Sequence, residues 1–109
     1  MLKKVKKAWG SEEWIVNNEH YCGKILNLKK GYRCSLHYHK LKDETFYILE
    51  GIVKMEVGDR ELIMKPKESI HILPGMSHRF TGLKDSKIIE FSTQHFEEDS
   101  YRKILSGKV

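Results

Sequence analysis

Short runs of β-forming residues, each closed by a turn, constrain the fold of this chain more than any other feature. The runs recur roughly every ten residues, a spacing typical of all-β domains. Turn-forming residues separate them, as at Asn17-Asn18, Gly51, Gly58-Asp59 and Pro74-Gly75. Before residue 96 no stretch has the periodicity of a long helix. The sequence therefore predicts an all-β fold, an antiparallel β-barrel or sandwich.

The predicted strands occupy most of the chain between residues 14 and 92. They are 14–16, 21–28, 32–39, 45–49, 52–57, 61–65, 69–73, 78–81 and 87–92. Residues 1–10 are expected to form a solvated N-terminal arm. Residues 96–107 place Tyr101, Ile104 and Leu105 at helical spacing, with acidic residues first and Gly107 as a stop. This pattern predicts a short C-terminal helix.

Length and composition narrow the class of protein. The 109 residues, 39% of them hydrophobic, fit a single domain, 1–109, with a modest core. A net charge of +5 favours anionic partners, but no aromatic-basic RNA motif or recognition helix accompanies it, so no nucleic-acid partner is expected. The basic start leads into no apolar run of signal-peptide or membrane-span length. We therefore expect a cytoplasmic protein with no membrane partner.

Four side chains form a candidate metal site. His37, His39 and Glu44 lie within eight residues, and His78 follows much later. Strand alternation places His37 and His39 on one face, and Glu44 can join them if the chain turns within residues 40–43. Such a set suits one divalent transition metal: Zn, Mn, Fe, Ni or Co. A His-x-His pair alone is more commonly solvated or hydrogen-bonded, so the hypothesis needs all four to converge.

The same alternation predicts the neighbours of this site. Phe46 and Ile48 share the face of Glu44 and would provide apolar walls, while Ser35 and Arg33 share the face of His37 and would contact a polar substrate. Cys34, of opposite parity, is expected to face away from the metal. Both cysteines, Cys22 and Cys34, are expected as free thiols in a cytoplasmic protein.

Several other candidate site residues could equally have a purely structural or surface role. Four basic residues also fit solvated surface charges: Arg33, Lys42, Arg79 and Arg102. His71 also fits a hydrogen-bonded strand residue, His20 a turn residue, and His95 a surface or capping residue.

The spacing around the candidate site resembles a known family. Five residues match the first motif of the cupin superfamily: Gly31, His37, His39, Glu44 and Gly51. Three more resemble its second motif: Pro74, Gly75 and His78. Gly82 stands where the second motif often has asparagine, and Pro74 directly precedes the glycine, but neither departure touches a candidate ligand. The resemblance implies a jelly-roll barrel, the double-stranded β-helix, with one metal held by three histidines and one glutamate.

Within cupins, the chain is similar to the C-terminal mannose-6-phosphate isomerase-like domain of bifunctional mannose-1-phosphate guanylyltransferase/mannose-6-phosphate isomerases. The similarity extends from Lys7-Ala8-Trp9-Gly10, through the two motifs and Arg79, to Glu97-Glu98-Asp99 and Arg102. Three positions depart from those domains, where His37 replaces glutamine, Ala8 replaces proline and Lys42 replaces arginine. A lysine cannot make the bidentate contacts of a guanidinium with phosphate.

This resemblance implies a sugar or sugar-phosphate isomerase or epimerase with the metal as Lewis acid. The candidate bases are Lys42, His71 or a metal-bound hydroxide, and basic residues such as Arg79 and Arg102 would hold an anionic sugar at the mouth. Two alternatives stay open: a metal-dependent dioxygenase, and a non-catalytic sugar-binding or sensing protein. A homodimer is expected, since open barrels leave strand edges that invite pairing.

Overall fold

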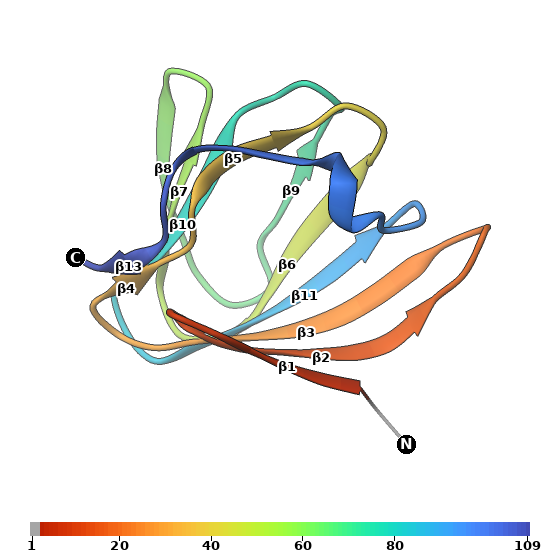
Figure 1. The fold of residues 1–109 in the computed structure, drawn as a ribbon. Coiled ribbons are helices and arrows are strands. Elements are labelled where there is room, and N and C mark those ends of the chain that lie inside the picture. Colours follow the sequence, from red (N-terminus) through yellow and green to blue (C-terminus); the bar gives the residue numbers. More distant parts are fainter. Residues whose placement is uncertain (1–2) are drawn as a thin grey trace.

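Two antiparallel sheets face each other in the computed structural model, which describes residues 3–109 (Figure 1). The first sheet has the order β1 (Lys3–Lys7), β2 (Gly10–Asn17), β3 (Cys22–Leu28), β11 (Ser86–Ser92), β6 (Glu44–Glu50) and β9 (Ser69–Ile72). The second has the order β12 (Ser100–Ile104), β5 (Leu36–His39), β10 (His78–Gly82), β4 (Tyr32–Arg33) and β13 (Gly107–Lys108). Off that path, β7 (Val53–Val57) pairs with β10, and β8 (Arg60–Met64) pairs with β7. The predicted all-β, antiparallel architecture is confirmed.

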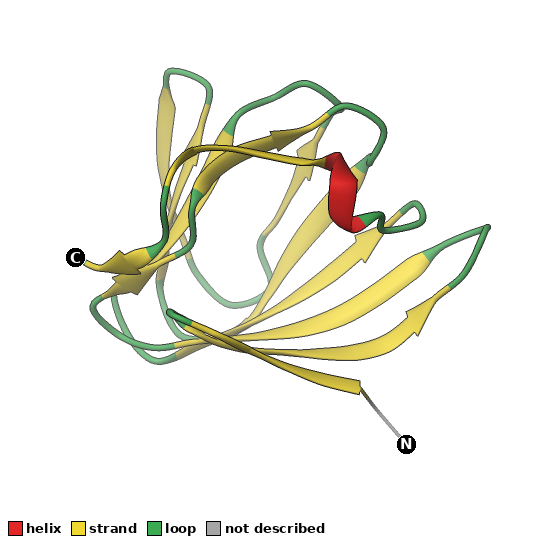
Figure 2. Cartoon of the chain, in the orientation of Figure 1, coloured by secondary structure: helices red, strands yellow, loops and turns green. Residues whose placement is uncertain are grey.

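Strands and loops make up nearly all of the described chain, and helical structure is confined to one short turn (Figure 2). That turn is the 3-10 helix η1 (Glu97–Asp99). Among residues 3–109, no helix is both long enough and apolar enough to cross a bilayer.

The space between the sheets is apolar at one end and polar at the other. Strands β3, β6 and β11 pair side by side, so that Leu26, Ile48 and Ile88 lie next to one another in the core. Two residues further along the same strands, Lys24 lies opposite Glu90. Both charged side chains are almost fully buried. Because strand side chains alternate, one set of inward positions builds the core and then lines a polar cavity.

A buried tryptophan attaches the N-terminal hairpin to the core. Trp9 is 4% exposed and packs edge-on against Phe80, with ring centroids 5.2 Å apart. The next residue, Gly10, has φ +150°, and a Cβ atom there would overlap the carbonyl oxygen of Asn27. A glycine is therefore required for β2 to approach β3 this closely.

The structures predicted for the two chain ends, a solvated arm and a helix, are both wrong. Lys3–Lys7 of the predicted arm is a strand paired with β2, while Met1 and Leu2 lie outside the described residues. In place of the helix predicted over 96–107, the chain forms η1 and then β12, which pairs with β5. The residues at helical spacing are all exposed in the observed structure, so apolar burial does not decide the conformation of this segment. The backbone instead finds hydrogen-bond partners on the edge of β5.

Candidate metal centre

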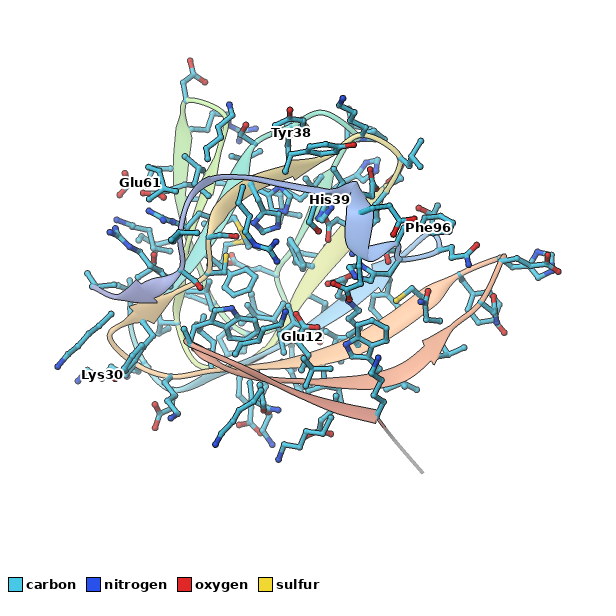
Figure 3. The ribbon with its side chains drawn as sticks, viewed as in Figure 1. Glu12, Lys30, Tyr38, His39, Glu61 and Phe96 are labelled. Carbon is cyan, nitrogen blue, oxygen red and sulfur yellow. The ribbon has the colours of Figure 1, made fainter. Side chains whose placement is uncertain are left out.

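The four predicted metal ligands lie in one cluster. His37 and His39 lie on β5, Glu44 begins β6, and His78 begins β10 as the cross-strand partner of His37. Ring nitrogens of the three histidines lie within 4.8 Å of one another. Glu44 Oε2 lies 3.3 Å from Nε2 of both His39 and His78. Figure 3 shows His39 on the inner side of β5 and Tyr38 on the outer side, as strand alternation requires.

Backbone carbonyls fix the orientation of all three imidazoles. Each Nδ1 lies within hydrogen-bond distance of one carbonyl oxygen: Ser35 O at 2.8 Å from His37, Asp99 O at 3.1 Å from His39, and Met76 O at 2.9 Å from His78. Because a carbonyl oxygen only accepts, each Nδ1 must carry the hydrogen and donate it. In a neutral imidazole the other nitrogen, Nε2, then presents a lone pair. Three such lone pairs and one carboxylate therefore converge.

This arrangement fits a divalent cation. Burial, reinforced by the nearby His78, lowers the pKa of His37 to about 3, and burial also lowers the pKa of His39. These imidazoles are therefore neutral at pH 7. Glu44 Oε2 and His78 Nε2 are buried without a hydrogen-bond partner, which is costly unless a cation lies between them. Their 3.3 Å separation suits two atoms that each lie roughly 2.1 Å from one ion.

One residue of the C-terminal turn supports two parts of the cluster. The buried carboxylate of Asp99 accepts backbone N–H groups from Lys40 at 2.9 Å, Leu41 at 3.1 Å and Lys42 at 3.0 Å. Its carbonyl oxygen accepts the Nδ1 hydrogen of His39. Asp99 thereby fixes both a ligand ring and the segment that leads into Glu44.

Replacing Asp99 with alanine should destabilise the protein by about 1–3 kcal/mol, because the buried N–H of Lys42 and the part-buried N–H groups of Lys40 and Leu41 lose their acceptor. Metal affinity should fall as well, since segment 40–42 would lose its support. Chemical denaturation and metal titration measure the two effects. Glu98→Ala, which removes a neighbouring exposed acid, is the matched control. Equal stability of the two variants would contradict this role for Asp99.

Three members of the cluster, His37, His39 and Glu44, line a cavity of about 70 Å³ between the sheets. Four of the other predicted site residues line it: Ser35, Lys42, Phe46 and Arg102. The Ser35 hydroxyl also lies 3.0 Å from His37 Nδ1. Phe46 is buried beside His78, whereas Arg102 is exposed at the mouth.

The remaining predicted site residues lie outside the cavity lining. Arg79 is buried and donates to the carbonyls of Cys34 and Leu105, at 2.9 and 3.2 Å. Ile48 belongs to the apolar core, Arg33 is half-buried on β4, and His71 is exposed on β9, where it contacts Asp43. The arginines and His71 therefore do not join the metal cluster.

The predicted orientation of Cys34 is wrong. Cys34 lines the cavity, where its sulfur accepts the backbone N–H of Phe80 at 3.2 Å. The prediction assumed one continuous strand over 32–39, but the chain leaves strand geometry between β4 and β5, and alternation does not continue across that break. Both cysteines are free thiols, as predicted, and burial raises the pKa of Cys34 to about 12.

A buried ion pair lies next to the cluster. Lys42 Nζ is 3.0 Å from Glu90 Oε2, and the two side chains are 2% and 6% exposed. Burial by itself would lower the pKa of Lys42, but attraction to Glu90 and Glu44 outweighs it and raises that pKa. Burial would raise the pKa of Glu90, and attraction to Lys42 and Lys24 lowers it instead. Lys42 therefore keeps its proton at neutral pH and donates hydrogen bonds.

Sequence reasoning missed His95, which was expected at the surface. Its side chain is only 9% exposed and lines the cavity. The residue follows β11 in a loop, where strand alternation gives no signal. Long-range contacts bury it: its ring packs edge-on against Trp14 at 5.1 Å, and its backbone exchanges two hydrogen bonds with the side chain of Asn17.

His95 should make stability fall with acidification. Burial, followed by the charges of Lys42 and Lys24, lowers the pKa of His95 from 6.5 to about 4. Between these values the unfolded chain binds a proton that the folded protein excludes. Stability is therefore complete above pH 6.5 and declines as the pH falls toward 4, by up to about 3 kcal/mol from this residue. The stability difference between wild type and His95→Gln should shrink by that amount.

Denaturation curves at pH 7, 5.5 and 4, recorded with a chelator so that metal loss does not contribute, measure this difference. His20→Gln, at an exposed histidine, should leave the wild-type pH dependence unchanged. A constant difference between wild type and His95→Gln across the range would contradict the shifted pKa.

The chain is similar in sequence to a known family and to several known proteins. Residues 24–91, more than half of the chain, match the family model described as the cupin domain. The chain is 29% identical over 105 residues to mannose-1-phosphate guanylyltransferase 2 of Escherichia coli O157:H7, covering 93% of this chain and 22% of that protein. Over 64 residues it is 34% identical to oxidoreductase OpS7 of Beauveria bassiana, covering 58% of this chain and 21% of that protein.

Among solved structures, KdgF from Halomonas sp. superposes with a TM-score of 0.80 at 14% identity, covering 90% of this chain and 89% of that one. This likeness bears on the fold and confirms the predicted jelly-roll barrel. The chain spans about a fifth of the length of each of the two sequence relatives.

Proposed function

This chain belongs to the cupin family, and on that premise we propose that it is a metal-dependent isomerase or epimerase of a sugar or sugar phosphate. The convergence of three fixed imidazole lone pairs and Glu44 carries the proposal. The similarity to mannose-1-phosphate guanylyltransferase 2 directs it toward sugar phosphates.

A divalent ion held by His37, His39, Glu44 and His78 would serve as a Lewis acid toward the sugar carbonyl. The chain's own residues would do the rest. Phe46, which packs beside His78, would exclude water from the ligands and strengthen the electrostatic interactions around them. The Lys42 ammonium, held by Glu90, would donate a hydrogen bond to a sugar oxygen.

The charge of the cavity favours an anionic ligand. Four bases line it, Lys7, Lys24, Lys42 and Arg102, against four acids, Glu12, Glu44, Glu90 and Glu97. These charges cancel, four minus four, when the histidines are neutral. A bound divalent ion would therefore leave an excess of two positive charges, which attracts a phosphate or a carboxylate.

The cavity is large enough for only one end of such a ligand. About 70 Å³ holds only a few water molecules, so a whole hexose phosphate does not fit inside. The carbonyl end would lie within, near the metal ligands. The phosphate would remain at the mouth, where Lys7 and Arg102 keep part of their side chains in water.

Deuterium exchange tests this function even when the product has not been identified. An isomerase or epimerase that removes the proton beside the carbonyl should exchange it for deuterium in D2O. We expect protein loaded with Zn or Mn to catalyse this exchange on D-mannose 6-phosphate or another aldose phosphate of a small panel, as followed by proton NMR. Chelator-treated protein is the control. No exchange across the panel with any divalent metal would refute the proposal.

The ligand set also supports a second candidate, a metal-dependent dioxygenase. Three imidazoles and one carboxylate suit Fe(II) at least as well as Zn, and one relative is named as an oxidoreductase. Oxygen consumption by the iron-loaded protein, with the same sugars and without exchange in D2O, would favour this alternative. Saturable sugar binding with neither reaction would indicate a binding or sensing protein.

A further inference from the structure

One buried polar atom outside the metal cluster has no hydrogen-bond partner. Among the described residues, three buried side-chain atoms have no hydrogen-bond partner: Glu44 Oε2, His78 Nε2 and His95 Nδ1. The first two lie 3.3 Å apart within the cluster. His95 Nδ1 does not belong to it, and a buried polar atom of this kind calls for a partner from outside the chain.

The state of the His95 ring is fixed from its other side. Its Nε2 lies 3.2 Å from Glu97 Oε1. At pH 7 the ring is neutral, because burial and the charges of Lys42 and Lys24 lower its pKa to about 4. The ionised carboxylate of Glu97 only accepts, so Nε2 carries the hydrogen and Nδ1 holds a lone pair. His95 is thus an acceptor in the lining of the cavity.

The buried charged groups that line the cavity beside His95 are already engaged. Lys42 is charged and paired with Glu90, and the carboxylate of Glu12 accepts Trp14 Nε1–H at 2.8 Å and lies 3.5 Å from Lys24 Nζ. The three imidazoles of the cluster direct their free nitrogens toward the proposed metal position. Within the described lining, His95 therefore combines neutrality, a buried lone pair and a carboxylate behind the ring.

We propose that His95 Nδ1 is the proton acceptor for a ligand in this cavity, with Glu97 as its positioning residue; the proposal rests on the proposed isomerase function. Nδ1 would take the proton from the carbon beside the carbonyl. That C–H electron pair forms a C=C bond, while the carbonyl π pair moves to oxygen. The hydroxyl proton then passes to that oxygen, the carbonyl re-forms one carbon along, and the imidazolium returns its proton to the neighbouring carbon. Nothing is oxidised or reduced overall.

The decisive variant is His95→Gln, which keeps a polar side chain but cannot take up a proton. In metal-loaded protein, exchange on D-mannose 6-phosphate should fall at least about 100-fold, the usual contribution of a general base. Metal content and sugar binding should stay within about threefold of wild type. Glu97→Gln should lower exchange by a smaller factor, and Glu98→Gln, which removes the same charge from an exposed side chain outside the cavity, should not.

Nitrogen-15 NMR of the His95 ring provides a readout that needs no turnover. At pH 7 it should report hydrogen on Nε2 and none on Nδ1, and D-mannose 6-phosphate should shift the Nδ1 resonance. Glu97→Gln should change the ratio of the two tautomers, an effect that a merely structural contact would not produce.

The outcomes separate the two proposals. Wild-type exchange that survives His95→Gln within threefold overturns the role of His95 and leaves the isomerase function standing. A shifted Nδ1 resonance without wild-type exchange overturns the isomerase and the proton transfer, and shows that His95 accepts a hydrogen bond from the sugar. An unshifted Nδ1 at saturating sugar overturns the role of His95 whatever the exchange result.

Discussion

Replacing His78 with alanine should lower metal affinity by more than about 100-fold, since the loss of a residue that only orients a ligand already costs 10- to 100-fold. His78 is fully buried and supplies one of the three convergent lone pairs. The variant should emerge from dialysis with under a tenth of an equivalent of metal, where wild type retains about one. Elemental analysis after dialysis measures both values. Its far-UV circular dichroism should remain that of a β-protein, because the backbone pairing of β10 with β5 and β7 does not depend on the imidazole.

Two further variants make this test specific. Glu44→Gln is nearly isosteric but removes the anionic charge, so it should also release the metal without opening a cavity in the core. His20→Ala removes an exposed histidine far along the chain and should leave metal content unchanged. Full metal occupancy in both His78→Ala and Glu44→Gln would exclude the proposed centre.

Replacing Glu90 with leucine should destabilise the protein by about 3 to 5 kcal/mol, because it leaves the Lys42 ammonium buried without its partner. Lys42→Met should cost less, because the Glu90 carboxylate still faces Lys24 and accepts the Ser92 hydroxyl. The double variant Lys42→Met/Glu90→Leu should be considerably more stable than the sum of the single losses predicts, since it removes both buried charges together. Urea denaturation of the four proteins completes the cycle.

A surface pair supplies the comparison. Lys54 Nζ lies 3.8 Å from Glu61 Oε1, with side chains 30% and 61% exposed. Glu61→Gln should therefore cost less than about 1 kcal/mol. Additive losses in the Lys42–Glu90 cycle would show that the two charges do not depend on each other, and would remove the reason for treating them as one unit in the cavity wall.

The strands and turns were predictable because their signals are local. Side chains alternate along a strand, so Leu26 and Lys24 of β3 share one face, and both are buried. Likewise, His37 and His39 are two residues apart on one strand and necessarily share a face. At the chain ends the local signal was misleading. The spacing of Tyr101, Ile104 and Leu105 favours a helix, but backbone pairing with β5, which is remote in sequence, determined a strand.

By itself, the sequence determined the β-architecture, the spacing of three metal ligands and the family, because each has a signal in the pattern of residues near each other along the chain. Only the tertiary structure decided what surrounds them. Pairing of β10 with β5 brings His78 beside His37, and the C-terminal turn places Asp99 under segment 40–42. His95 is likewise buried in the cavity wall by residues that are distant in sequence. Such burial is a property of the folded chain, and no local sequence pattern encodes it.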